Sequence, residues 1–201
     1  QERFPRKGSC LLHRKGEKQM QPLELYIHIP FCVKKCAYCD FLSGPAGEKE
    51  KEEYVKMLVD EIRNCPDTVQ NYRVISVFFG GGTPSLLTGE QIGRLMDTVR
   101  EIFTLDEDAE ITMEMNPGTV TEEKLRKYRQ AGVNRLSIGL QSVNDEELRL
   151  LGRIHTYEEF REAYHLARAN GFSNINVDLI SAIPGQTVES WRRTLERVMA
   201  L

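Results

Sequence analysis

The sequence lacks several features that would assign it to a particular class of protein. No apolar run approaches the length needed to cross a bilayer, and no hydrophobic segment of secretory type is present. An excess of one charge is also missing, because 27 basic residues face 30 acidic ones for a net charge of −3. No basic stripe carries interleaved aromatic side chains either. We therefore expect no membrane span and no nucleic-acid partner.

Cysteine is scarce, yet three of the five cysteines lie in one short segment. Cys32-Val-Lys-Lys-Cys36-Ala-Tyr-Cys39 follows directly after an apolar segment that alternates like a strand. Three thiolates at this spacing can bind three irons of a [4Fe–4S] cluster, whereas complete protein ligation would need four cysteines. The fourth iron then keeps an open coordination position, which distinguishes a catalytic metal site from a structural one.

Disulfides and zinc are the alternative uses of these three cysteines. Loops this short close into a disulfide only with strain, and nothing in the sequence indicates secretion. Zinc is the stronger alternative, because His28 precedes Cys32 and could complete a Cys3His set. However, structural zinc sites more often divide their ligands into two separated pairs. Cys10 and Cys65 match no ligand spacing, and all five thiols fit a reducing compartment, so we expect a cytoplasmic protein.

Strand-like and helix-like segments alternate along the sequence after Met20, and we expect five of each. The predicted strands are Leu23–Ile29, Val74–Phe79, Ala109–Met115, Arg135–Gln141 and Asn174–Ile183. This alternation predicts an α/β fold of parallel βαβ units, arranged either as part of a barrel or as an open doubly wound sheet. The last helix is expected to bury a stripe made of Val188, Trp191, Leu195 and Val198.

The two ends of the sequence differ from the rest. Residues 1–19 are polar, rich in Lys and Arg and without periodicity, and we interpret them as a non-native or disordered leader. A mitochondrial transit peptide is the alternative, although Glu2, Glu17 and the lack of an apolar face argue against it. Residues 20–201 then form a single α/β domain. Because the sequence stops within or at the end of a predicted helix, we interpret this domain as incomplete.

Polar and glycine-rich residues follow the ends of the predicted strands. The cysteine segment follows the first strand, and Gly80-Gly81-Gly82-Thr83-Pro84 follows the second. Glu114 and Gln141 end the third and fourth strands, and Asp178 lies within the fifth. In parallel α/β folds the carboxyl ends of the strands meet at one edge, so these five segments are expected to face one site.

The chemistry of these residues suits a polar organic ligand. Glycines let backbone groups approach a ligand closely, although the run has neither P-loop nor Rossmann spacing and could be only a tight turn. Glu114 and Asp178 could accept from a ribose hydroxyl or an amino group, and the planar guanidinium of Arg153 suits a carboxylate. Taken singly, each carboxylate is more often a cap or a surface charge, and Arg153 an exposed ion-pair partner.

Several longer motifs together resemble one known family. Leu25-Tyr-Ile-His-Ile-Pro-Phe-Cys32 and Cys36-Ala-Tyr-Cys39-Asp-Phe41 are followed, in the family's order, by Phe79-Gly-Gly-Gly-Thr-Pro84, Glu114-Met-Asn-Pro-Gly118, Gly132-Val-Asn-Arg-Leu-Ser-Ile-Gly-Leu-Gln-Ser142, Leu151-Gly-Arg-Ile-His155, Asn176-Val-Asp-Leu-Ile180 and Ile183-Pro-Gly-Gln-Thr187. From Leu23 to Leu201 the sequence resembles the oxygen-independent coproporphyrinogen III oxidase family of the radical S-adenosylmethionine (SAM) superfamily. The resemblance implies a partial (β/α)6 barrel, here truncated after about five βα units and without the family's C-terminal domain.

The resemblance also implies a cofactor set and its ligands. A [4Fe–4S] cluster would be held by Cys32, Cys36 and Cys39, and SAM would occupy its open iron. The SAM contacts would be Gly81, Gly82 and Thr83 at the methionine moiety, Arg153 at its carboxylate, Glu114, Gln141 and Asp178 at the ribose and neighbouring polar atoms, and Tyr26 and Tyr38 nearby. An electron donor such as a flavodoxin would reduce the cluster, which could then cleave SAM to methionine and a 5′-deoxyadenosyl radical, unless SAM is mainly structural.

One position separates two branches of this family. The oxidases carry a further cysteine two residues after the third, where this sequence has Phe41. The Cys-Asp-Phe ending is similar to the haem chaperone branch, whose members bind haem and deliver it to apo-proteins. We therefore expect a haem chaperone, and whether it is also an enzyme stays open. A coproporphyrinogen III oxidase or another radical-SAM oxidoreductase is the second interpretation, and a cysteine-rich structural metal module is the third.

Overall fold

The computed structural model describes residues 20–201, so the predicted leader and Cys10 lie outside the described residues. Five strands form one parallel sheet in the order β1-β2-β3-β4-β5. They are β1 (Gln21–Ile29), β2 (Tyr72–Gly81), β3 (Thr104–Met115), β4 (Arg135–Gln141) and β5 (Asn174–Leu179). A doubly wound sheet reverses its strand order at a switch point, whereas this order follows the chain. The arrangement is therefore that of a partial barrel, and the predicted fold class is confirmed.

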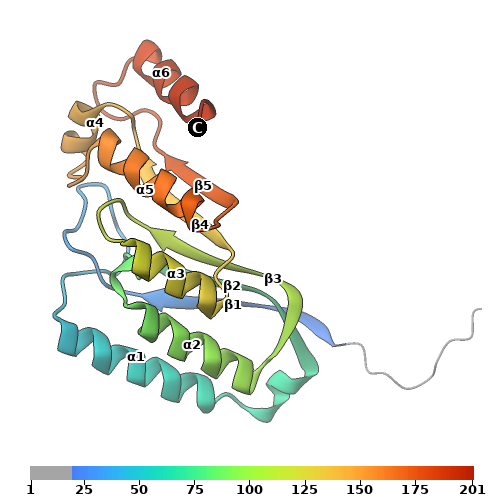
Figure 1. Cartoon of the computed structure of the whole chain (residues 1–201). Helices are drawn as coiled ribbons and strands as arrows, with labels where there is room; N and C mark the ends of the chain where they lie inside the picture. Colours follow the sequence, from blue (N-terminus) through green and yellow to red (C-terminus); the bar gives the residue numbers. More distant parts are fainter. Residues whose placement is uncertain (1–19) are drawn as a thin grey trace, which may run out of the picture.

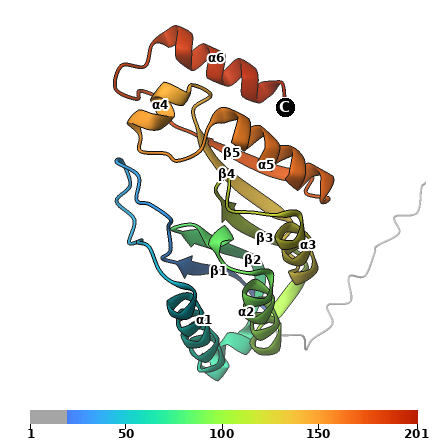
Figure 2. The ribbon, with the colours of Figure 1, turned by 60° about the vertical axis from the view of Figure 1, so that its left-hand side comes forward.

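Four helices cover one face of this sheet (Figure 1). They are α1 (Glu48–Arg63), α2 (Gly89–Ile102), α3 (Glu122–Ala131) and α5 (Tyr157–Ala169). Short elements complete the fold: η1 (Asp67–Asn71), η2 (Pro84–Leu86), α4 (Asp145–Leu150) and α6 (Val188–Met199). Figure 2 shows α1, α2 and α3 side by side on that face, as expected for successive right-handed crossovers.

Alternation along the strands divides the sheet into an apolar and a polar face. Val77 and Phe79 of β2, Met113 of β3 and Ile138 of β4 are fully buried beneath the helices. Because successive side chains of a strand point to opposite faces, the intervening residues, among them Glu114, point to the other face. The polar groups are thereby kept out of the core and gathered on the concave side.

Several element bounds differ from the prediction, and β3 begins at Thr104 instead of Ala109. Strand β5 ends at Leu179 instead of Ile183, because Ala182 takes a left-handed φ of 58° and Pro184 has no backbone N–H to continue a ladder. Helix α4 was not predicted, since six residues are too few to show a helical period. Its N-cap is Asn144, whose side chain accepts a hydrogen bond from the N–H of Glu146 at 2.9 Å.

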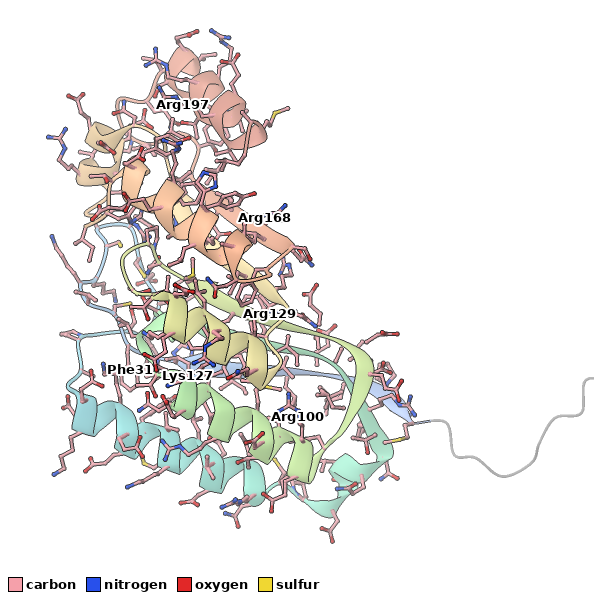
Figure 3. The ribbon with its side chains drawn as sticks, in the orientation of Figure 1. Phe31, Arg100, Lys127, Arg129, Arg168 and Arg197 are labelled. Atoms are coloured by element: carbon pink, nitrogen blue, oxygen red, sulfur yellow. The ribbon has the colours of Figure 1, made fainter. Side chains whose placement is uncertain are left out.

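None of the four residues of the predicted α6 stripe is fully buried, and Trp191 and Val198 are half-buried. Val188 is 86% exposed and Leu195 is 38% exposed, whereas Thr194 is fully buried. Helix α6 lies beyond β5 at the end of the molecule (Figure 1), so only one side of it meets the rest of the described chain. Figure 3 shows Arg197 of α6, whose guanidinium lies over the ring of Tyr157 of α5 at 5.4 Å.

Candidate functional site

One cavity lies at the carboxyl ends of the strands, between the cysteine loop and α4. Eleven of the twelve predicted site residues line it, and they come from six separate segments of the chain. These residues are Cys32, Cys36, Tyr38, Cys39, Gly81, Gly82, Thr83, Glu114, Gln141, Arg153 and Asp178. Segments that are distant in the sequence therefore lie together at one edge of the sheet, as expected.

The start of the cysteine loop is fastened to the glycine loop after β2. The N–H of Gly82 donates to the carbonyl of Ile29 at 2.8 Å, and the N–H of Thr83 donates to that of Phe31 at 2.6 Å. A Cβ on Gly82 would lie 2.6 Å from the Phe31 carbonyl oxygen, so only glycine fits here. The ring of Phe31, labelled in Figure 3, meets Tyr54 of α1 edge-on at 5.2 Å. The first cysteine thus follows a rigidly held residue.

The middle of the cysteine loop rests on the segment after α4. The N–H of Ala37 donates to the carbonyl of Leu151 at 3.0 Å. Gly152 has a φ of 75°, and a Cβ there would lie 3.2 Å from the Ala37 nitrogen. The N–H of Cys39 donates to the carbonyl of Cys36 at 3.2 Å, which closes a turn between these two cysteines. Contacts from the glycine loop after β2 and from the segment after α4 therefore hold the start and the middle of the three-cysteine segment.

The three cysteines line one cavity, and His28 does not join them there. Within residues 20–201, no three His, Cys, Asp or Glu side chains come close enough to hold one metal ion. The irons of a cluster occupy separate corners, so its three thiolate ligands surround a shared cavity instead of one point. The proposed fourth zinc ligand, His28, donates from Nε2 to the Leu42 carbonyl at 3.1 Å and does not line the cavity. A Cys3His zinc site would therefore lack its histidine ligand.

Two carboxylates face the cavity from neighbouring parts of the sheet. Glu114 accepts a hydrogen bond from the N–H of Gly81 at 3.0 Å, and burial raises the pKa of its carboxyl group. The negative charge of Asp178 raises that pKa further. Asp178 itself accepts from Ser137 Oγ at 3.1 Å and from Asn176 Nδ2 at 2.6 Å. Both acceptors are thus held in place by neighbouring donors.

Two further polar residues lie near the end of β4. Gln141 has a left-handed φ of 73°, uncommon for a residue with a side chain, and this bend carries it into the cavity. Arg153 donates from NH2 to the Gly139 carbonyl at 2.7 Å. Its Nε is buried and has no partner among the described residues. Arg153 also lines the cavity, and a guanidinium with an unpaired donor suits an anionic group such as a carboxylate.

The two predicted tyrosines occupy different places. Tyr38 lines the cavity, and burial raises the pKa of its phenol to about 12. Tyr26 does not line it: its ring stacks on Phe78 with 6.0 Å between centroids, and its hydroxyl donates to His28 Nδ1 at 3.3 Å. The contact with a ligand stays a prediction for both residues.

Some cavity residues have no predicted role. Asn116, Thr119, Ser137 and Gly139 line the cavity although the sequence reasoning assigned them nothing. Asn116 stands two residues after Glu114, directly behind the strand end, and that position was the available signal. Ser137 lies on the same face of β4 as Gly139, but its hydrogen bond to Asp178 of β5 requires the strand pairing to be known.

Residues 26–198 match the family model of the Radical SAM superfamily. The chain belongs to this superfamily. It is 45% identical over 184 residues to "Heme chaperone HemW" of Escherichia coli strain K12, covering 91% of this chain and 49% of that protein. It is 40% identical over 182 residues to the oxygen-independent coproporphyrinogen III oxidase of Salmonella typhimurium, which covers 90% of this chain and 40% of that protein. These similarities confirm the resemblance inferred from the motifs.

A solved structure supports the same assignment. The coproporphyrinogen III oxidase (HemN) of Escherichia coli, a radical SAM enzyme, superposes with a TM-score of 0.81 at 39% identity. The match covers 89% of this chain and 42% of that one. The chain thus spans about half or less of the length of the relatives that it matches. Among residues 20–201, no helix is long and apolar enough to cross a membrane.

Proposed function

We propose that this chain carries the radical-SAM site of a haem chaperone. The observation that supports this most directly is that three cysteines, the glycine loop and Arg153 line one cavity. Cys32, Cys36 and Cys39 are the proposed cluster ligands. Three thiolates leave one iron open, and the cavity beside them has room and polarity for SAM.

Each polar group of the cavity has a proposed part in holding SAM. Arg153 binds the carboxylate, while the backbone of Gly81, Gly82 and Thr83 borders the methionine moiety. The ribose and neighbouring polar atoms are placed against Glu114, Gln141 and Asp178, with Tyr38 nearby and Tyr26 at the margin. When bound and reduced, the cluster supplies an electron for cleavage of a C–S bond of SAM. The chain contributes orientation and the exclusion of water.

Haem is the proposed cargo, and apo-haem proteins are the proposed recipients. Phe41 supports the chaperone over the oxidase, because it lines the cavity where the oxidases carry a further cysteine. The relative named as a heme chaperone is 45% identical, and the relative named as an oxidase is 40% identical. A flavodoxin-type electron donor and a cytoplasmic location complete the proposal.

The cluster is tested by anaerobic reconstitution of the chain with iron and sulfide. We expect about four irons and four sulfides per chain and a brown protein. Replacing Cys32, Cys36 or Cys39 by Ala should abolish this loading. Cys65→Ala is the matched control and should load normally, since Cys65 lies at the end of α1 and outside the cavity. Loading that survives all three substitutions would refute the assignment.

Haem handling is tested on the reconstituted chain by titration with haem, followed in the Soret region. Stoichiometric binding, with coproporphyrinogen left unconverted in the presence of SAM and a reductant, is expected. Formation of protoporphyrinogen would instead identify an oxidase and show that Phe41 does not separate the two branches. Loading with iron but no haem binding would limit the proposal to the cluster and SAM.

A further inference from the structure

Asn116 connects two of the proposed ligand-binding residues. Its Oδ1 accepts a hydrogen bond from Arg153 NH2 at 2.6 Å, and its Nδ2 donates to Thr83 Oγ1 at 2.8 Å. A guanidinium only donates, so the amide orientation follows from this partner. Asn116 therefore bridges the glycine loop after β2 and the segment after α4, which are 70 residues apart, from Thr83 to Arg153, in the sequence.

The bridge continues at both ends to a thiol. Thr83 Oγ1 lies 3.5 Å from Cys32 Sγ, and Arg153 NH1 lies 3.6 Å from Cys36 Sγ. A continuous chain of polar contacts thus runs from one proposed cluster ligand to another, with Asn116 in the middle. Losing the central residue would release the side chains on both sides, because each has few other partners that fix its position.

Gly139 makes room for this bridge. A Cβ at position 139 would lie 2.9 Å from Asn116 Oδ1 and 3.1 Å from Arg153 NH2. The carbonyl of Gly139 also accepts from Arg153 NH2 at 2.7 Å. With NH2 engaged by these two acceptors, the guanidinium of Arg153 is fixed at its NH2 end, while NH1 lies beside Cys36 Sγ.

We propose that Asn116 is a positioning residue that holds Arg153 against β4 and the Thr83 hydroxyl beside Cys32. The effect of this positioning on SAM binding rests on the proposed function. Asn116 holds the guanidinium in the position from which it would bind the SAM carboxylate. It also lowers the cost of binding, because the long arginine side chain is already ordered before the ligand arrives.

The clamp on Arg153 is tested first in the chain without cluster or SAM. Phenylglyoxal modifies accessible guanidinium groups, and peptide mapping by mass spectrometry gives the rate at Arg153. We expect Asn116→Ala to raise this rate several-fold. Asn116→Asp should restore the slow rate, because a carboxylate can accept from Arg153 and from the Thr83 hydroxyl. An Asn116→Ala chain modified at the wild-type rate would overturn the proposal.

The control for this experiment is Asn134→Ala. Asn134 also makes two hydrogen bonds, from Nδ2 to the Ala109 carbonyl at 2.8 Å and from the N–H of Ile111 to Oδ1 at 2.8 Å. It lies before β4, at the opposite end of that strand from Gln141. A general loosening of the fold would therefore accelerate modification in both alanine variants, and that result would also count against a specific role for Asn116.

The ligand consequence is tested on the reconstituted chain by equilibrium dialysis of SAM. Asn116→Ala should retain the iron content but raise the Kd for SAM about tenfold, the effect of one hydrogen bond to a charged group. Asn134→Ala should leave the Kd unchanged. A wild-type Kd in Asn116→Ala would overturn the role in ligand binding. Failure of the loaded wild-type chain to bind SAM would refute the proposed function, whereas the modification rates at Arg153 would still decide the clamp.

Discussion

Glu114 accepts a hydrogen bond from the backbone N–H of Gly81 at 3.0 Å, which joins the end of β3 to the glycine loop. Burial and then the charge of Asp178 raise the pKa of Glu114, and the Gly81 hydrogen bond only partly offsets burial. A carboxyl whose folded pKa is raised favours folding most below its unfolded pKa, near 4.3. That contribution is lost as the pH rises through the folded pKa.

Glu114→Gln should therefore stabilise the chain without cofactors at neutral pH. The amide oxygen can still accept from Gly81, but no buried charge forms. We expect a gain in the free energy of unfolding of up to about 1 kcal/mol at pH 7.5, disappearing toward pH 4. Urea unfolding at both pH values measures it. A gain that is larger at pH 4 than at pH 7.5 would contradict the assigned direction. In the reconstituted chain the same variant should bind SAM more weakly.

Gly82→Ala should destabilise the chain and prevent cluster loading. The added methyl group would meet backbone atoms of Ile29 and Phe31, which cannot move without separating β1 from the glycine loop. We expect a loss of about 1–3 kcal/mol in the free energy of unfolding. Gly93→Ala is the control, because nothing lies within 4 Å of its Cβ in α2. It should raise stability by about 0.5–1 kcal/mol. Equal effects at both positions would show that the close approach at Gly82 is unimportant.

The main elements of the fold could be predicted because each carries a local signal. Thr88 and Gln91 form a capping box at the start of α2, Thr156 and Glu159 form one at the start of α5, and Gly132 ends α3 with a φ of 105°. Strand order could not be predicted from such signals. Both a barrel segment and a doubly wound sheet contain the same alternation. What separates them is the pairing of β3 with β4, because the doubly wound order would place β4 beside β1.

The candidate site was predictable where function follows from position at a strand end. Its supporting residues were not, because their roles depend on partners distant in the sequence. Ser137 donates a hydrogen bond to Asp178, and Asn116 accepts one from Arg153. Neither pair has a fixed spacing in the sequence. The predicted burial of α6 was wrong for a different reason. An apolar stripe shows that a helix has an apolar face, but not which element packs against it.

Tyr128→Phe should weaken the fold without changing the residues of the cavity. The buried hydroxyl of Tyr128 donates to the Leu87 carbonyl at 2.6 Å and lies 3.2 Å from that of Ser85. Removing it leaves a buried acceptor unpaired, which costs about 1–3 kcal/mol of the free energy of unfolding. Tyr164→Phe is the control, since its hydroxyl makes no hydrogen bond within the described residues, and it should cost under about 0.5 kcal/mol. Urea unfolding of both variants measures the difference, and equal losses would contradict it.

His155 should make the stability of the chain fall in acid. Its Nε2 donates to the Leu140 carbonyl at 3.3 Å, and burial together with the charge of Arg153 lowers the pKa of its imidazole to about 4. A histidine with a depressed folded pKa favours folding above its unfolded pKa, near 6.5, and loses that contribution as the pH falls through the folded value.

His155→Gln should therefore remove one part of the acid dependence. The amide can still donate to Leu140 but does not titrate. Between pH 7 and pH 4 the wild type should lose on the order of 2–3 kcal/mol more than the variant. Urea unfolding at several pH values in this window gives the two curves, and all other titrating groups contribute to both. The free energy of unfolding should fall more steeply for the wild type than for the variant between pH 7 and pH 4, because only the wild type carries the titrating imidazole. Parallel curves would show that His155 is protonated as easily in the folded chain as in the unfolded one.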